Sequence, residues 1–265
     1  MNILEKIKAH KQKEVSRRKE LIPNALLEQS VYFDTRPLSM VEYLKRPDKS
    51  GIIAEFKRQS PSKGAINPYA KVEQVSIGYM QAGASGLSVL TDTEFFGGKN
   101  ADLTEARKFN YCPILRKDFI LDEYQIIEAK SIGADVILLI GDMLTKEEVV
   151  RLSAFAKSLG LEVLMEVHDE KPLDYLNPNI DLVGVNNRDL TNFKVDTQTS
   201  ERLSEIIPNE FTKISESGIS HPETVVRLKE FGFEGFLIGE HFMKNAHPEK
   251  ACQDFIQQIN QLTHA

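Results

Sequence analysis

The chain has 265 residues, of which 41% are hydrophobic, so it can bury a sizeable core in one large domain or two small ones. Its 33 basic and 39 acidic side chains are well mixed and give a formal net charge of −6, unlike the basic footprint of a nucleic-acid-binding protein. No apolar run approaches the roughly 18 residues of a membrane span, and the N-terminus lacks the apolar core of a signal peptide. We therefore expect a cytoplasmic protein without a nucleic-acid or membrane partner.

Apolar residues at positions 3, 4, 7 and 15 stand among charged ones, which predicts a helix over residues 2–20. Pro23 interrupts this pattern. Two shorter helical segments, 24–29 and 40–44, precede the first apolar run. Residues 1–48 are therefore expected to form a helical extension that covers one end of the domain.

From Gly51 onward, short apolar runs alternate with longer amphipathic segments. The candidate strands are 52–57, 86–91, 113–117, 136–140, 162–167, 182–186, 212–215 and 235–238. The candidate helices between them are 71–82, 102–108, 123–132, 146–159, 170–176, 200–206, 222–231 and 248–262. Eight alternating units predict parallel strands closed into a (β/α)8 TIM barrel, with residues 1–265 as a single domain. A doubly wound open sheet is the alternative.

Glycines recur just before several of these strands. Gly83, Gly133, Gly160 and Gly232 each follow a candidate helix and suit a left-handed helix C-cap. This recurrence supports the interpretation that the chain is built from repeated strand–helix units.

Polar residues gather at the C-terminal ends of six strands, where the loops of a barrel carry its active site. Lysines and carboxylates crowded into one concave mouth shift each other's pKa and can serve as acid and base. A single charged residue at a strand end is usually only solvated or paired, but polar residues at six strand ends together indicate a site. The residues are Glu55 and Lys57, Arg116 to Asp118, Glu166 and His168, Asn186 to Asp189, Ser215 to Gly218, and Gly239 with Glu240.

Loops at this mouth carry further ligand-binding candidates. Gly218 and Gly239-Glu240 follow the last two strands, where barrels often bind phosphate through backbone N–H groups. Residues 60–64 are richer in Ser, Lys and Gly than a simple turn requires, which indicates a mobile lid. Phe96 belongs either to the core or to a stacking contact with a flat ring.

The cysteines and histidines suggest no metal site. Cys112 and Cys252 fit no metal-ligand spacing and are interpreted as reduced structural thiols. His168 has no partner at metal spacing, and His221 precedes Pro222 as an expected helix cap. We interpret both histidines as structural or surface residues.

Together these motifs resemble those of the indole-3-glycerol phosphate synthase family over essentially the whole chain. The resemblance is carried by residues 53–64 (IAEFKRQSPSKG), 113–119 (PILRKDF), 166–168 (EVH), 184–190 (GVNNRDL) and 215–219 (SESGI). It implies a (β/α)8 barrel with an N-terminal helical extension. It also implies conversion of the phosphorylated substrate 1-(2-carboxyphenylamino)-1-deoxyribulose 5-phosphate into indole-3-glycerol phosphate, CO2 and water in tryptophan biosynthesis, without metal or organic cofactor.

By this resemblance Lys117 is the general acid that protonates the substrate carbonyl during ring closure. Glu166 is the base or acid of the later dehydration, and Lys57, held by Glu55, lies near the substrate carboxylate and the developing hydroxyl. Asn186 and Glu216 orient the substrate and the proton donors. The division of proton transfers between Lys57 and Lys117 stays open, and the acid is expected to be a lysine whose pKa is lowered by neighbouring cations.

The substrate contacts follow from the same resemblance. Arg188 and Ser60 are candidates for the carboxylate and Phe96 for the anthranilate ring. We expect Glu240 to bind phosphate through its backbone N–H, because a carboxylate would repel the anion. The phosphate candidates are Ser217, Gly218, Gly239 and Glu240.

Three other interpretations remain. Phosphoribosylanthranilate isomerase, another phosphate-binding barrel, would need a catalytic cysteine, yet Cys112 precedes its strand. A Schiff-base aldolase would use Lys117 as nucleophile, and a non-catalytic barrel would only bind or scaffold. A monomer is the expected state.

Overall fold

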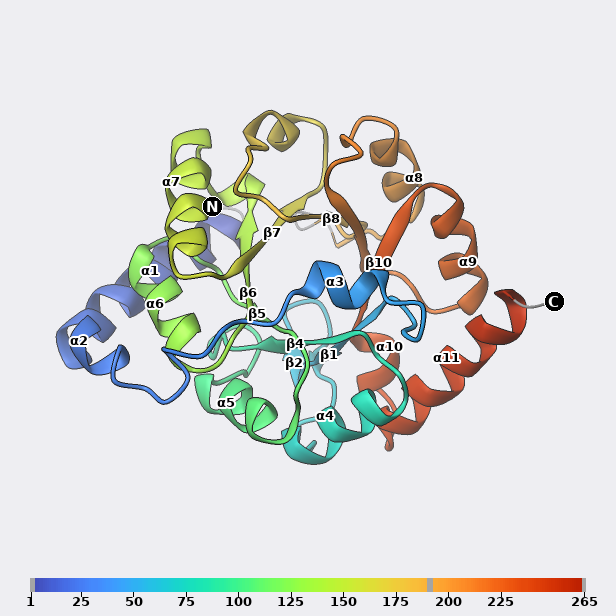
Figure 1. Cartoon of the computed structure of the whole chain (residues 1–265), viewed down its shortest axis with the longest axis horizontal. Helices are drawn as coiled ribbons and strands as arrows, with labels where there is room; N and C mark the ends of the chain where they lie inside the picture. The colour runs from blue at the N-terminus through green and yellow to red at the C-terminus, as the bar shows by residue number, and fades with distance from the viewer. Residues whose placement is uncertain (1–2, 190–192, 264–265) are drawn as a thin grey trace.

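The computed structural model describes residues 3–189 and 193–263, and eight parallel strands within them close into a barrel (Figure 1). Around the barrel the strands run in the order β1, β4, β5, β6, β7, β8, β9, β10 and back to β1. The predicted (β/α)8 barrel is thus confirmed, and the open sheet is wrong. The bounds are β1 (Ile52–Phe56), β4 (Gly86–Leu90), β5 (Ile114–Lys117), β6 (Val136–Ile140), β7 (Glu162–Val167), β8 (Leu182–Asn186), β9 (Thr212–Glu216) and β10 (Phe233–Ile238).

Helices surround the barrel and bury its outer face (Figure 1). The strands are therefore covered on both sides and read as nearly continuous apolar runs, such as the fully buried VILLI of β6. All four predicted cap glycines have φ between +77° and +96°, which confirms the left-handed C-caps. The outer helices are α4 (Val72–Gln81), α5 (Asn100–Phe109), α6 (Glu123–Ser131), α7 (Lys146–Ser158), α8 (Gln198–Ser204), α9 (Pro222–Glu230) and α11 (Pro248–Thr263).

The structure differs from the predicted elements in several places. The helix predicted over 170–176 is the 3-10 turn η2 (Lys171–Tyr175), and α8 begins and ends two residues before the predicted segment. Two short helical elements were not predicted, η1 (Gly141–Met143) after β6 and α10 (Glu240–Met243) after β10. Their three and four residues are too few to show a helical period.

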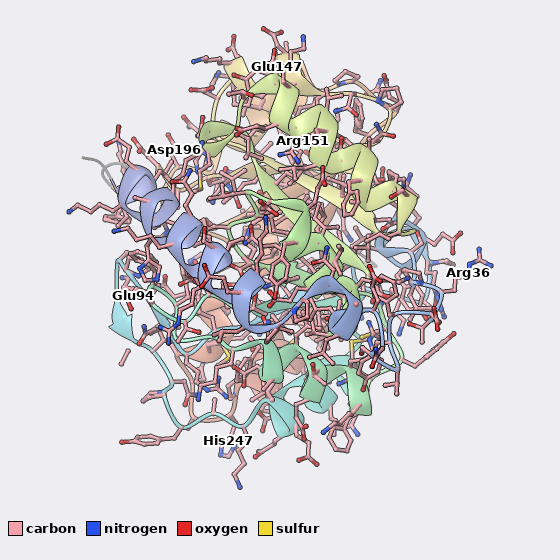
Figure 2. All side chains as sticks on the ribbon, turned by 90° about the vertical axis from the view of Figure 1, so that its left-hand side faces the viewer. Arg36, Glu94, Glu147, Arg151, Asp196 and His247 are labelled. Carbon is pink, nitrogen blue, oxygen red and sulfur yellow. The ribbon has the colours of Figure 1, made fainter. Side chains whose placement is uncertain are left out.

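The N-terminal extension covers both ends of the barrel instead of one. It consists of α1 (Ile3–Leu21), α2 (Asn24–Leu27) and α3 (Met40–Lys45). α3 lies over the N-terminal end, where Met40 and Leu44 occupy the space left by Gly86 and Gly235. α1 lies lengthwise across the molecule, with its N-terminal end near Asp196 (Figure 2). Met1 and Asn2, the first residues of the predicted extension, lie outside the described residues.

Both cysteines are buried and free, as predicted. None of the described helices is long and apolar enough to cross a lipid bilayer.

Candidate active site

A cavity of about 550 Å³ opens at the C-terminal ends of the strands. Residues from all eight strands meet in its wall with residues from the loops after β1, β4, β5, β8, β9 and β10. The structure thus brings together all thirteen residues singled out from the sequence. They are Glu55, Lys57, Ser60, Phe96, Lys117, Glu166, Asn186, Arg188, Glu216, Ser217, Gly218, Gly239 and Glu240.

Lys117 lies at the centre of the polar cluster. Its Nζ is 2.7 Å from Glu166 Oε2 and 2.5 Å from Glu216 Oε2. Glu55 belongs to the same group and accepts a 2.7 Å hydrogen bond from Lys57 Nζ, as the two-residue spacing suggested. The four side chains other than Lys57 come from β1 (Glu55), β5 (Lys117), β7 (Glu166) and β9 (Glu216), which are alternate strands of the barrel. Alternate strands contribute the side chains of one layer, which explains why the four meet.

The charge environment of Lys117 is the opposite of the expected one. Burial alone would lower the pKa of its ammonium, but the carboxylates of Glu166, Glu216 and Glu55 outweigh burial and raise the pKa above its usual value. The prediction of a pKa lowered by neighbouring cations is therefore wrong. Lys117 is held as a protonated ammonium, the form that a general acid must have before it acts.

The two carboxyls beside Lys117 differ in their tendency to hold a proton. Burial raises the pKa of Glu216, and the negative charges of Glu166 and Glu55 raise it further against the opposing charge of Lys117. Burial also disfavours the charged form of Glu166, but Lys117, His168 and a 2.9 Å hydrogen bond from Asn186 lower its pKa below the usual range. Glu166 is therefore the member of the pair that is held ionised, and Glu216 is the one that binds a proton more readily.

Two glycines make room for these carboxylates. A Cβ at Gly184 would lie 2.3 Å from Glu216 Oε1, and a Cβ at Gly239 would lie 2.4 Å from Glu55 Oε1. Any side chain at either position would push a carboxylate out of the cluster. Gly184 was part of a quoted motif but was not singled out, because a glycine inside a strand shows no function until its neighbours are known.

The loop after β9 has an unusual backbone. Ser217 and Gly218 are consecutive residues with φ of +68° and +75°, and a Cβ at Gly218 would lie 2.3 Å from Val195. A non-glycine residue in the left-handed region is strained, and such strain tends to occur at functional sites. The geometry fits a loop whose main chain faces a ligand.

Charged and aromatic side chains complete the mouth. Arg188 donates a 3.2 Å hydrogen bond to Glu240, and Lys63 lies 3.7 Å from the same carboxylate. The ring of Phe96 packs 5.9 Å from that of Phe119, centroid to centroid. The predicted lid segment is a short antiparallel hairpin of β2 (Gln59–Ser60) and β3 (Gly64–Ala65), and its mobility stays a prediction. Leu190, the last residue of one quoted motif, lies outside the described residues.

Several lining residues were not singled out from the sequence. Ile3, Leu4 and Ile7 of α1 form an apolar part of the wall, and their i, i+1, i+4 spacing was visible as a helix face. His168, interpreted as structural or on the surface, lies behind Glu166, with its Nε2 3.9 Å from Glu166 Oε1. Within residues 3–189 and 193–263, no group of three or more His, Cys, Asp or Glu side chains is placed to hold a metal ion.

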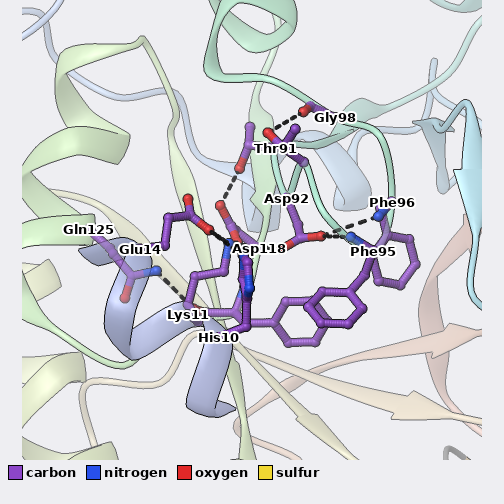
Figure 3. A network of polar contacts seen from close by, with 12 residues as sticks. His10, Lys11, Glu14, Thr91, Asp92, Phe95, Phe96, Gly98, Asp118 and Gln125 are labelled. Atoms are coloured by element: carbon purple, nitrogen blue, oxygen red, sulfur yellow. Dashed lines mark hydrogen bonds and ion pairs between the residues drawn. The ribbon is translucent and has the colours of Figure 1, made fainter. Parts of the chain in front are cut away.

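α1 is fastened to the mouth by a buried lysine (Figure 3). Lys11 is 0% exposed, and its Nζ lies 2.8 Å from Asp92 and 3.0 Å from Asp118. Asp92 in turn accepts hydrogen bonds from the backbone N–H groups of Phe95 and Phe96 at 2.7 and 3.2 Å. Although burial opposes the charge, the two aspartates raise the pKa of Lys11 above its usual value. Lys11 thus links α1 to the loop of Phe96 and to the residue after Lys117.

Removing this lysine should destabilise the protein strongly. Lys11→Met would leave the buried carboxylate of Asp92 without its cation and would take one of two cations from Asp118, which keeps Arg116 at 3.1 Å. Such a change costs about 3 kcal/mol or more. Lys19→Met is the matched control, because Lys19 is on the same helix, 46% exposed and paired with Asp122, and should cost less than about 1 kcal/mol. Urea unfolding measures both. Equal midpoints for the two variants would contradict this role of Lys11.

With this geometry in place, comparison with known proteins identifies the family. Residues 4–255 match the family described as Indole-3-glycerol phosphate synthase. The chain belongs to the indole-3-glycerol phosphate synthase family. The indole-3-glycerol phosphate synthase of Bacteroides thetaiotaomicron is 47% identical over 97% of this chain and 99% of its own length. Indole-3-glycerol phosphate synthase 2 of Ralstonia nicotianae is 42% identical over 97% of each chain, and the synthase of Caldanaerobacter subterraneus is 41% identical over 97% and 98%.

This membership confirms the resemblance drawn from the motifs and favours the synthase over the isomerase and over a non-catalytic barrel. The isomerase interpretation also lacks the catalytic thiol that it requires at the cavity. Cys112 is 0% exposed and precedes β5, at the end of the barrel away from the cavity, and burial raises its pKa to about 12.

Proposed function

We propose that the cavity at the barrel mouth closes the indole ring of 1-(2-carboxyphenylamino)-1-deoxyribulose 5-phosphate, with loss of CO2 and water. The observation that carries this proposal is the Lys117 ammonium, held between two buried carboxylates at 2.7 and 2.5 Å. Ring closure needs an acid within hydrogen-bond reach of the carbonyl oxygen, because that oxygen gains a proton as the ring carbon attacks. A lysine kept protonated by its neighbours meets this need.

The later steps use the other members of the layer. Loss of CO2 returns an electron pair to the ring and restores its aromaticity. Lys57, 2.7 Å from Glu55, protonates the departing hydroxyl, and Glu166 accepts the proton released as the indole forms. Asn186 and Glu216 hold Glu166 and Lys117 in place through hydrogen bonds of 2.9 and 2.5 Å.

The substrate's two anionic ends face different parts of the mouth. The phosphate lies at the backbone of Ser217 and Gly218 and at Gly239 and Glu240, where α10 begins. Its carboxylate lies at Arg188 and Ser60, and the ring lies against Phe96. Glu240 already bonds to Arg188 through its carboxylate, which supports a role for its backbone N–H in phosphate binding.

A pair of substrates tests the proposal. The purified chain is mixed either with the carboxyphenylamino-deoxyribulose phosphate or with its precursor, phosphoribosylanthranilate. The chain has no tryptophan, so indole fluorescence rises over a low background. We expect a rise with the first substrate and no conversion of the second. Conversion of the second alone would favour the isomerase.

A further inference from the structure

The turn after β9, where the substrate phosphate is proposed to bind, has a backbone conformation that needs support. Ser217 and Gly218 have φ of +68° and +75°. A residue with a Cβ is disfavoured in the left-handed region, so this conformation persists at Ser217 only where surrounding contacts hold it. The contacts that hold Ser217 therefore decide how the main chain of the turn faces the cavity.

Asn187, the residue after β8, contacts three consecutive residues at this point. Its backbone N–H donates a 2.9 Å hydrogen bond to the carbonyl of Glu216. Its side-chain amide donates hydrogen bonds of 3.0 and 3.1 Å to the hydroxyl of Ser215 and the carbonyl of Ser217. Asn187 is 3% exposed, so water competes little for these contacts. One residue thus ties the turn to the end of β8.

The amide of Asn187 has a single orientation. Its Oδ1 accepts hydrogen bonds of 3.1 and 2.8 Å from the backbone N–H and the hydroxyl of Ser200 in α8. A backbone N–H can only donate and a backbone carbonyl can only accept, so Oδ1 must face Ser200 and Nδ2 must face Ser217. Because both donors and the acceptor of the amide are engaged, Asn187 is a rigid support for the turn.

The contact with the Ser217 carbonyl also orients the next N–H group along the chain. In a trans peptide, the C=O of one residue and the N–H of the next point in opposite directions. Asn187 holds the Ser217 C=O on the outer side of the barrel, where its amide lies between β9 and α8. The Gly218 N–H is therefore turned the other way, toward the cavity that Gly218 lines. An N–H group aimed in this way can donate a charge-assisted hydrogen bond to a phosphate oxygen.

We infer that Asn187 positions the turn of Ser217 and Gly218 for the phosphate of the substrate and so determines the affinity for the phosphorylated end. This inference rests on the proposed function. Asn186 and Arg188, the neighbours of Asn187 in the sequence, line the reaction cavity, and consecutive residues of an extended chain point to opposite sides. Asn187 is thus a positioning residue that acts through the Ser217 carbonyl and does not touch the substrate.

The test measures the binding of inorganic phosphate to the wild type and to Asn187→Ala by NMR titration, which needs no turnover. We expect the Kd for phosphate to rise about 10-fold or more in the variant, because a hydrogen bond to a charged group is lost when the Gly218 N–H is no longer oriented. KM for the phosphorylated substrate should rise by a similar factor. The reacting groups keep their contacts, so kcat should fall by less than about threefold.

Asn110→Ala is the matched control. Asn110 is 7% exposed and follows α5, at the end of the barrel away from the cavity. Its amide donates hydrogen bonds of 2.9 and 2.8 Å to the hydroxyl of Ser76 and the carbonyl of Ala106, the same two kinds of partner that Asn187 has. This variant should lose stability as Asn187→Ala does, but its Kd for phosphate should match that of the wild type.

Asn187→Ser carries the test should Asn187→Ala fail to fold. Its hydroxyl can still bond to Ser200 or Ser215, but the shorter side chain ends before the Ser217 carbonyl, so the Kd for phosphate should rise in the same way. The inference is overturned if a folded Asn187 variant binds phosphate within about twofold of the wild type, if Asn110→Ala loses as much affinity, or if the wild type binds no phosphate.

The proposed function can fail separately from this inference. A wild type that binds phosphate but forms no indole product would remove the proposed ring closure, while a weakened Asn187→Ala would still support the role of Asn187 in anion binding. An active wild type whose folded Asn187 variants bind phosphate normally would remove the role of Asn187 alone.

Discussion

Replacing Lys117 by methionine is expected to lower kcat roughly 10³-fold, which corresponds to about 4 kcal/mol of transition-state stabilisation. Methionine keeps the length and apolar stem of the side chain but removes the ammonium that lies 2.7 and 2.5 Å from the two carboxylates. Without that acid the carbonyl oxygen cannot gain its proton and the ring carbon cannot attack. Because ring closure precedes decarboxylation, a single-turnover experiment should release neither CO2 nor indole product.

Lys57→Met is the matched comparison, because it removes the other lysine of the same cluster. Here ring closure should proceed and CO2 should be released, while dehydration stalls and the indole product lags behind. Counting both products in one turnover assigns each proton transfer. Rapid release of CO2 by Lys117→Met would contradict its role, and borohydride trapping of Lys117 with substrate would instead support a Schiff base.

Glu166→Gln is expected to lower kcat roughly 10²-fold or more with little change in KM. The amide keeps the size of the side chain but cannot accept the proton released as the indole forms. It also removes one of the carboxylates that raise the pKa of Lys117. Lys117 acts in its protonated form, so a lower pKa means that this form is lost at a lower pH. The decline of kcat on the alkaline side should therefore begin at lower pH in Glu166→Gln than in the wild type.

Glu162→Gln controls for a general effect on β7. Glu162 lies on the same strand, at its opposite end, and its carboxylate accepts hydrogen bonds from Ser39 and from the backbone N–H of Met40. The glutamine retains an oxygen that can accept, and the pH profile of kcat should match the wild type. An unshifted alkaline limb in Glu166→Gln would show that Glu166 does not set the proton affinity of Lys117.

The barrel, and the residues that line its mouth, could be predicted from the sequence for a physical reason. Parallel strands buried on both faces give apolar runs, and a barrel places the residues that end those runs on one rim. Glu55 and Lys57, or Asn186 and Arg188, stand where an apolar run stops. Their positions therefore follow from local sequence once closure is assumed.

The charge environment could not be predicted in the same way. Lys117 contacts Glu166 and Glu216 because β5, β7 and β9 are alternate strands whose side chains meet in one layer. That contact depends on the stagger of the whole barrel, so the pKa of Lys117 was assigned the wrong direction. Likewise, the position of α1 depends on the burial of Lys11 between Asp92 and Asp118, which no local pattern reveals. Elements such as η1, which carries the Asp142 beside His168, are too short to show a helical period in the sequence.

The central claim is that this mouth couples ring closure to decarboxylation. The most direct measurement supplies the purified chain with substrate labelled with carbon-13 at the carboxyl group and follows all carbon-containing products by NMR. We predict that labelled CO2 and unlabelled indole-3-glycerol phosphate appear in equal amounts until the substrate is consumed. Label retained in the organic product, or substrate left unchanged by folded protein, would contradict the claim.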